Sequence, residues 1–266
     1  MWIPTLYFVE GIPYFLVNNV SVLMFAKMGV PNGQMALFTS LLYLPWTLKF
    51  LWSPFVDIIK TKRWWIITMQ IIMSIAFVVQ ALTMPHPSAE SIAAGSTPMS
   101  LFSFTLILFV FAAFASATHD IAADGFYMLA QSSQAAFVGV RSTFYRLANV
   151  FGNGVIVAVA GLLETRTGNI PLAWQLTIGG SGILLTGLTL YHTFAIPKPE
   201  SDVPNIQEDS GNKVAEIFEG FGRTVTTYFK KPGVWLAIIF MLCYRLPEAF
   251  LIKMCTPFLV AAREAG

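Results

Sequence analysis

The sequence predicts an all-α membrane protein, and three observations support this class. Apolar residues make up 56% of the chain and charged residues only 11%, whereas a soluble domain averages about 25% charged residues. The mean hydropathy is +0.66. The stretch from Met99 to Thr118 contains no charged side chain, and about 20 such residues are enough for one helix to cross a bilayer.

Apolar segments along the chain predict seven membrane-spanning helices. The predicted spans are Trp2–Ala26, Gln34–Val56, Trp64–Met84, Met99–Phe126, Phe144–Leu163, Pro171–Ile196 and Gly233–Ala262. We therefore expect three parts: a six-helix transmembrane bundle over residues 1–196, a cytoplasmic linker over 197–231, and a seventh transmembrane helix over 232–266. Apolar residues at helical spacing within the linker predict an amphipathic helix on the inner membrane surface.

The distribution of Lys and Arg predicts the orientation in the lipid bilayer. The connection between the second and third spans holds Lys60, Lys62 and Arg63, and the connection between the sixth and seventh holds five basic residues. The Pro85–Pro98 loop on the opposite side has none. Because basic loops stay on the cytoplasmic side, we expect a multi-pass protein with a cytoplasmic N-terminus.

The first and seventh predicted spans are similar to each other. Gly11–Pro13 aligns with Arg245–Pro247, and polar residues follow the proline in both spans. This internal similarity suggests two parallel six-helix halves joined by a long cytoplasmic loop. We therefore expect the chain to be a fragment that holds the first half and the first helix of the second, and the full-length protein to be a monomer.

Two acids and a histidine lie at the C-terminal end of the fourth predicted span. Asp120 and Asp124 are one helical turn apart on the same face, and acids inside a membrane are costly unless they face a cavity or a counter-charge. We expect this pair to take up and release a proton, with His119 as a relay; a structural ion pair is the alternative. Arg141 and Arg146 enter the next span, and Arg146, among apolar residues, is predicted to pair with Asp120 or Asp124.

A second set of polar residues predicts contacts with a solute. Glu10 lies in the first span close to Pro13, which weakens the helix and frees backbone carbonyls for a cavity. Asn18 and Asn19 follow further along the span. Lys49, in the second span, either contacts the solute or extends to the inner interface.

The connection between the second and third spans combines one acid with a basic cluster. Asp57 precedes Lys60, Lys62 and Arg63, and this arrangement predicts a gating loop that latches helix ends together. Ordinary cytoplasmic positive charge explains the three bases but not Asp57.

Four segments together resemble the major facilitator superfamily, in particular its branch of AmpG-type muropeptide permeases and acetyl-CoA transporters. The segments are Leu6–Pro13, Tyr43–Asp57, Ala117–Gly125 and Arg141–Leu147. The resemblance implies a proton-driven symport permease of twelve or more helices that works by alternating access. It implies a polar, anionic solute in a bacterial inner membrane, with anhydro-muropeptide from cell-wall recycling as first choice and acetyl-CoA as the alternative. Ser53 and Lys60 replace two glycines of the superfamily's loop motif, so only Asp57 and the basic cluster carry over.

Two other classes are weighed against a transporter. A membrane enzyme could use His119 and Asp120 as a catalytic pair, but no metal-ligand spacing and no nucleophile motif accompany them. We therefore expect no enzyme activity, no cofactor, no metal and no nucleic-acid partner. A sensor that binds a similar solute without moving it is the other alternative.

Overall fold

The computed structural model describes residues 2–203 except 131–133, and then residues 219–220, 222–223, 226–227, 229–237, 239–240 and 243. The chain divides into two compact units, Met1–Gln207 and Glu208–Gly266. In the second unit, Arg223 pairs with Glu219 at 3.0 Å. The apolar positions of the predicted amphipathic helix lie outside the described residues, as does the seventh predicted span from residue 244 onwards. Both stay predictions.

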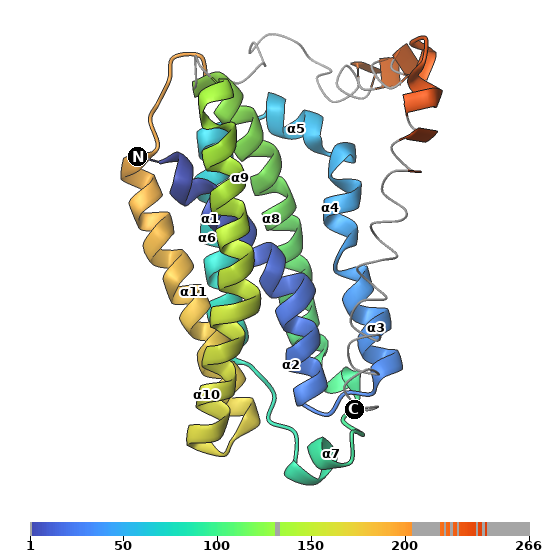
Figure 1. The fold of residues 1–266 in the computed structure, drawn as a ribbon, viewed down its shortest axis with the longest axis vertical. Helices are drawn as coiled ribbons and strands as arrows, with labels where there is room; N and C mark the ends of the chain where they lie inside the picture. The colour runs from blue at the N-terminus through green and yellow to red at the C-terminus, as the bar shows by residue number, and fades with distance from the viewer. Residues whose placement is uncertain are drawn as a thin grey trace, which may run out of the picture. The chain divides into compact units, whose positions relative to one another are not determined.

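The first unit is built from helices (Figure 1). In chain order they are α1 (Ile3–Phe15), η1 (Leu16–Val20), α2 (Ser21–Lys27), α3 (Asn32–Leu41), α4 (Leu44–Leu48), η2 (Lys49–Leu51), α5 (Ser53–Ile58), α6 (Lys62–Leu82), α7 (Ala89–Ala93), η3 (Met99–Phe102), α8 (Ser103–Ala130), α9 (Gln134–Val150), η4 (Phe151–Ile156), α10 (Val157–Thr167) and α11 (Ile170–Ala195). The segments η1 and η4 are π-helical, and η2 and η3 are 3-10 turns.

Four helical stretches in the described part of the chain are long and apolar enough to cross a membrane. They are Ile3–Lys27, Lys62–Leu82, Met99–Ala130 and Phe137–Thr167, and they correspond to the first, third, fourth and fifth predicted spans. The sixth predicted span is the single helix α11 of 26 residues. Its length of about 39 Å exceeds the hydrocarbon thickness of about 30 Å. The predicted class, an all-α membrane protein, is confirmed.

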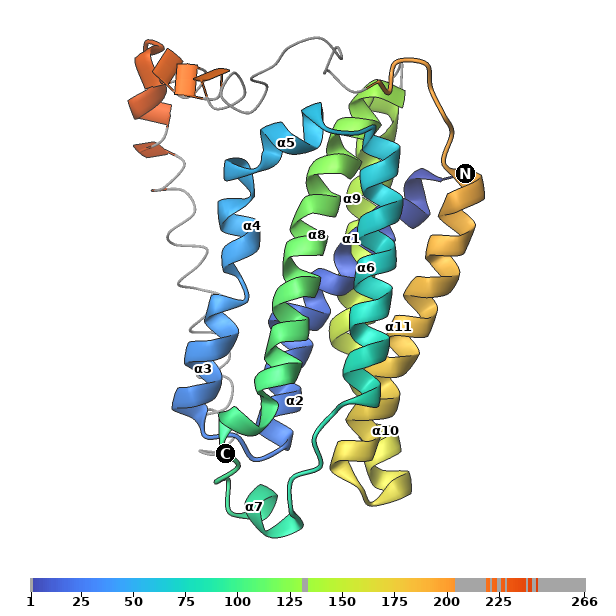
Figure 2. The ribbon, with the colours of Figure 1, turned by 180° about the vertical axis from the view of Figure 1, so that it is seen from behind.

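The second predicted span is not one continuous helix. It consists of α3, α4, η2 and α5. Pro45 and Pro54 interrupt it, because a proline ring clashes with the carbonyl group four residues earlier and a proline has no backbone N–H to donate. For Pro45 that carbonyl belongs to Leu41, where α3 ends, and for Pro54 it belongs to Phe50 in η2. Figure 2 shows α3 and α4 following one another on the α8 side, with α5 bent towards α6.

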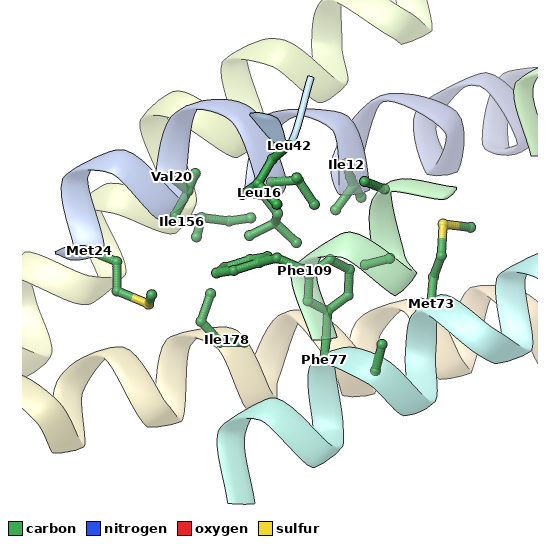
Figure 3. Close-up of a cluster of buried hydrophobic side chains, with 14 of the residues drawn as sticks. Ile12, Leu16, Val20, Met24, Leu42, Met73, Phe77, Phe109, Ile156 and Ile178 are labelled. Carbon is green, nitrogen blue, oxygen red and sulfur yellow. The ribbon is translucent and has the colours of Figure 1, made fainter. Parts of the chain in front are cut away.

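One hydrophobic cluster holds the long helices together. Helix α6 packs against both α8 and α11, and α1 packs against α8 and α9. The fully buried side chains between them include Ile12 of α1, Leu16 of η1, Phe77 of α6, Phe109 of α8 and Ile178 of α11, which Figure 3 shows converging. This packing fixes the relative positions of α1, α6, α8 and α11, which carry most of the polar residues described below.

Small residues bring α1 and α9 into close contact. A Cβ atom on Gly11 would lie 2.6 Å from the Cβ of Ala148, and one on Gly152 would lie 2.8 Å from the Cβ of Phe15. Glycine at both places therefore lets the two backbones approach each other. The π-helical segments η1 and η4 meet directly after these contacts.

Gly11→Ala is expected to lower the stability of the protein by about 1–3 kcal/mol, because the added methyl group overpacks the contact with Ala148. Gly161→Ala is the matched control, because Gly161 lies in a helix and nothing lies within 4 Å of the Cβ that alanine would add. Alanine has a higher helix propensity than glycine, so we expect this substitution to be neutral or to stabilise the protein by up to about 1 kcal/mol. Thermal unfolding of the full-length protein in detergent measures both. Equal melting temperatures for the two variants would contradict the close α1–α9 contact.

Candidate functional site

Two ion pairs form towards the C-terminal end of α8. Asp120 pairs with Lys49 of η2 at 3.5 Å, and Asp124, one turn further along, pairs with Arg141 of α9. Both basic side chains are 36% exposed, whereas Asp120 is 13% exposed. The two acids expected from the sequence are thus brought together with two bases that remain partly open to a ligand.

Two tyrosines surround Arg141. Its guanidinium lies 4.6 Å from the ring centroid of Tyr7 and 5.9 Å from that of Tyr127, within the range of a cation–π contact. The Tyr7 hydroxyl also donates a hydrogen bond of 3.4 Å to Oδ1 of Asp124. Sequence reasoning missed both tyrosines, although Tyr7 lies one turn before Glu10 on the same side of α1.

Glu10 is the third acid of this group. Its side chain is buried, and the charges that act on it are Asp120, Asp124, Arg141 and Lys49. Its Oε2 atom is buried without a hydrogen-bond partner, and Glu10 makes no ion pair within the described part of the chain. These five residues, called the charged cluster below, therefore contain three acids and two bases.

Arg146 does not take the place that the sequence predicted for it. The expected pairing with Asp120 or Asp124 is made by Arg141 and Lys49 instead, and Arg146 is exposed. Five residues turn a helix through about 500°, so Arg141 and Arg146 lie about 140° apart around α9. Only Arg141 can face α8 and α1.

A chain of buried polar side chains joins four helices next to the charged cluster. The Nε2 atoms of Gln70 and His119 are 2.9 Å apart, Oε1 of Gln70 lies 3.0 Å from Nδ1 of His192, and Nε2 of His192 lies 3.0 Å from Oγ1 of Thr5. Gln70 and both histidines are fully buried or nearly so. The network ties α1, α6, α8 and α11 together; sequence reasoning found only His119.

The orientation that the Gln70 amide has in this structure assigns one tautomer to each histidine. An amide oxygen can only accept, so Nδ1 of His192 carries the proton; an amide nitrogen can only donate, so Nε2 of His119 accepts and its Nδ1 carries the proton. Nδ1 of His119 is buried with no partner in the described structure. The relay role of His119 stays a prediction, and it would depend on this free N–H group.

The predicted gating loop joins the ends of two helices. The Asp202 carboxylate accepts hydrogen bonds from the backbone N–H groups of Lys62 and Arg63 at the start of α6, at 2.7 and 3.0 Å. The Arg63 guanidinium donates to the carbonyls of Thr193 and Ile196 at the end of α11, at 2.6 and 3.2 Å. Acids at helix N-termini and bases at C-termini both satisfy free backbone groups.

The remaining residues of that loop are placed as follows. The Lys62 side chain covers Gly125, where an added Cβ would lie 2.5 Å from its Cε. It thereby reaches α8 beside Asp124. Lys60 is exposed, and the side chain of Asp57 lies outside the described residues. A gating role for these residues stays a prediction.

The two asparagines of the first span differ. Asn18 donates to the backbone carbonyl of Tyr14 at 3.1 Å, whereas Asn19 is exposed and donates to Oδ1 of Asn153 at 3.0 Å. Asn153 in turn donates to Oδ1 of Asn149 at 2.7 Å. Sequence reasoning missed Asn149 of α9 and Asn153 of η4, two segments that both pack against α1.

An all-helical bundle with several apolar spans and a charged cluster inside it defines a multi-pass membrane protein. A family model described as acetyl-coenzyme A transporter 1 matches residues 2–151, which include Glu10, Lys49, Asp120, Asp124 and Arg141. The chain belongs to this family.

The curated relatives share only a low sequence identity with this chain. The anhydromuropeptide permease of Escherichia coli K12 is 25% identical over 265 residues, which cover 95% of this chain and 47% of the relative. An uncharacterized protein of Haemophilus influenzae is 21% identical over 262 residues, 95% of this chain and 55% of the relative. The chain spans about half the length of these curated relatives. No solved structure matches it significantly.

Proposed function

We propose that this chain forms the N-terminal part of a proton-coupled secondary transporter of the major facilitator type, which works by alternating access. The observation that carries the proposal is the charged cluster: three acids and two bases that come together from four segments of an apolar helical bundle, with both bases partly exposed. Such intramembrane charges are typical of ion and solute pathways. Membership of a transporter family supports the same conclusion.

The proposed solute is polar and anionic. Lys49 and Arg141 are partly exposed bases, and the arginine fork suits a carboxylate or phosphate. Anhydro-muropeptide is our first choice because a relative covering 95% of the chain is named an anhydromuropeptide permease. Acetyl-CoA is the alternative, favoured by the description of the family model. We propose a bacterial inner membrane, a cytoplasmic N-terminus and a monomeric full-length protein.

The charge balance of the cluster suggests how a proton is coupled. With all groups ionised, three acids against two bases leave one net negative charge, and one bound proton neutralises the cluster. The sequence assigned the proton to Asp120 and Asp124 and the solute to Glu10. Among the described residues both aspartates are ion-paired and Glu10 is not, so we propose that Glu10 carries the proton.

An anionic solute would then compete with the aspartates for the two bases. When its acidic group binds Arg141, Asp124 loses its counter-charge, and a proton on the cluster becomes more favourable. Solute and proton thus support each other's binding, which is the requirement for symport. Tyr7 contacts both partners of this ion pair, Asp124 through its hydroxyl and Arg141 through its ring, and so keeps them in position while the solute competes for Arg141.

Uptake by the full-length protein in liposomes tests this proposal. With an imposed inward proton gradient, we expect accumulation of radiolabelled anhydro-muropeptide above its external concentration, and no accumulation after the gradient is collapsed. Acetyl-CoA in parallel vesicles tests the alternative solute. Proton uptake without solute accumulation would identify a sensor, and chemical conversion of the solute would identify an enzyme.

A further inference from the structure

Three asparagines form a hydrogen-bonded ladder on the surface of the first unit. Asn19 donates to Asn153, and Asn153 donates to Asn149, at 3.0 and 2.7 Å. All three are exposed. Asn153, in the middle, uses both ends of its side-chain amide, accepting from Asn19 through Oδ1 and donating to Asn149 through Nδ2. Oδ1 of Asn19 and the side-chain nitrogen of Asn149 have no partner in the described structure. One end of the ladder offers an acceptor and the other a donor.

The ladder lies at a depth where exposed polar groups are costly. Asn19 and Asn153 both belong to stretches that are long and apolar enough to cross a membrane, Ile3–Lys27 and Phe137–Thr167, and both lie well inside them. A polar side chain at this depth faces a polar cavity or another part of the protein rather than lipid.

The backbone around the ladder is unusual on both helices. Asn19 lies in the π-helical segment η1 and Asn153 in the π-helical segment η4, and these two segments contact each other. Single π-helical turns inside α-helices occur frequently at functional sites. The close contacts of Gly11 and Gly152 hold the two segments together, so the ladder has a rigid support.

We propose that the asparagine ladder binds the uncharged amide and hydroxyl groups of the transported solute. This inference rests on the proposed transport function and adds a second contact region to it. Asn149 and Asn153 follow Arg141 by eight and twelve residues, about 12–18 Å along the helix. The ladder is thus separate from the charged cluster, and a solute amide can accept from Asn149 or donate to Asn19.

Thiol labelling in the full-length protein tests this inference without depending on transport. Val150 is 65% exposed and lies one turn before Asn153. In a background with Cys243, Cys255 and other native cysteines replaced, the thiol of a Val150→Cys variant is labelled with a maleimide. N-acetylglucosamine, which carries one amide and several hydroxyls, is expected to slow this labelling. Val138→Cys on the same helix, also exposed, is the unprotected control.

The ladder itself is tested by combining Val150→Cys with Asn153→Ala. Losing the central asparagine disrupts both hydrogen bonds, and we expect about tenfold more N-acetylglucosamine to be needed for half-protection. Asn32→Ala, at an exposed asparagine of α3, is the matched control and keeps the protection. If Asn153→Ala misfolds, Asn19→Ala tests the other end of the ladder.

Two outcomes would overturn the inference. One is the absence of protection by both N-acetylglucosamine and anhydro-muropeptide. The other is protection that survives Asn153→Ala while the melting temperature falls, because the ladder would then be a helix-to-helix contact only. Failure of the proposed function is distinguishable: labelling would be protected, but no solute would accumulate in liposomes.

Discussion

Arg141→Ala in the full-length protein is expected to reduce solute uptake to the level of protein-free liposomes. The substitution removes the counter-charge of Asp124 and the cation between the rings of Tyr7 and Tyr127 in one step. It also removes the fork that would bind the acidic group of the solute. Arg141→Lys keeps the charge but not the planar fork, so we expect it to retain a small part of the uptake.

Arg166→Ala is the control for this prediction, because Arg166 is exposed in α10 and lies far along the chain from the charged cluster. It is expected to transport like the wild type. Surface expression and melting temperature, measured for each variant, separate loss of transport from loss of folding. If Arg146→Ala abolished uptake while Arg141→Ala did not, the pairing expected from the sequence would be functional and the observed one incidental.

Glu10→Gln is expected to abolish accumulation driven by a proton gradient while preserving exchange of labelled for unlabelled solute. Glutamine has nearly the same shape as a protonated glutamate but cannot release a proton. The variant cluster keeps two acids against two bases, so it is neutral at all times and resembles the proton-loaded state. Exchange needs the solute site to alternate between the two sides, but it needs no net movement of protons.

Asp120→Asn is the comparison for Glu10→Gln. It leaves Lys49 without its partner at 3.5 Å, so we expect both accumulation and exchange to fall. Uptake and exchange measured in the same liposomes decide between the two acids. Should Asp120→Asn lose accumulation alone, with Glu10→Gln still accumulating solute, the proton site would be Asp120, as the sequence suggested.

The helices and the acids of the site could be predicted because they depend on local patterns. The uncharged stretch that ends at Thr118 specifies α8, and the spacing of Asp120 and Asp124 places them on one face. The break at Pro45 was missed. Hydropathy averaged over a span does not register a single proline. The helix nevertheless breaks there, because the ring of Pro45 would clash with the backbone carbonyl of Leu41.

The residues that complete the site depend on which helices are neighbours. The choice of Arg141 over Arg146 follows from the side of α9 that packs on α1, from which Arg141 reaches Asp124 of α8. The partner of His119, Gln70, comes from α6, and the partner of Asn19, Asn153, comes from η4. No spacing within one helix reveals such contacts, because each joins residues of different elements, 49 positions apart for Gln70 and His119 and 134 for Asn19 and Asn153.

The sequence by itself determined the class of this protein, the approximate positions of four helices long and apolar enough to span a membrane, and the acids of its charged cluster, since hydropathy and helical periodicity are properties of contiguous residues. Only the tertiary structure decided which base neutralises which acid, and that Glu10 is the acid of the cluster without an ion pair among the described residues. The physical reason is that charge compensation in a membrane is settled across helix interfaces, where packing of residues such as Gly11 and Ala148 sets which side chains can meet.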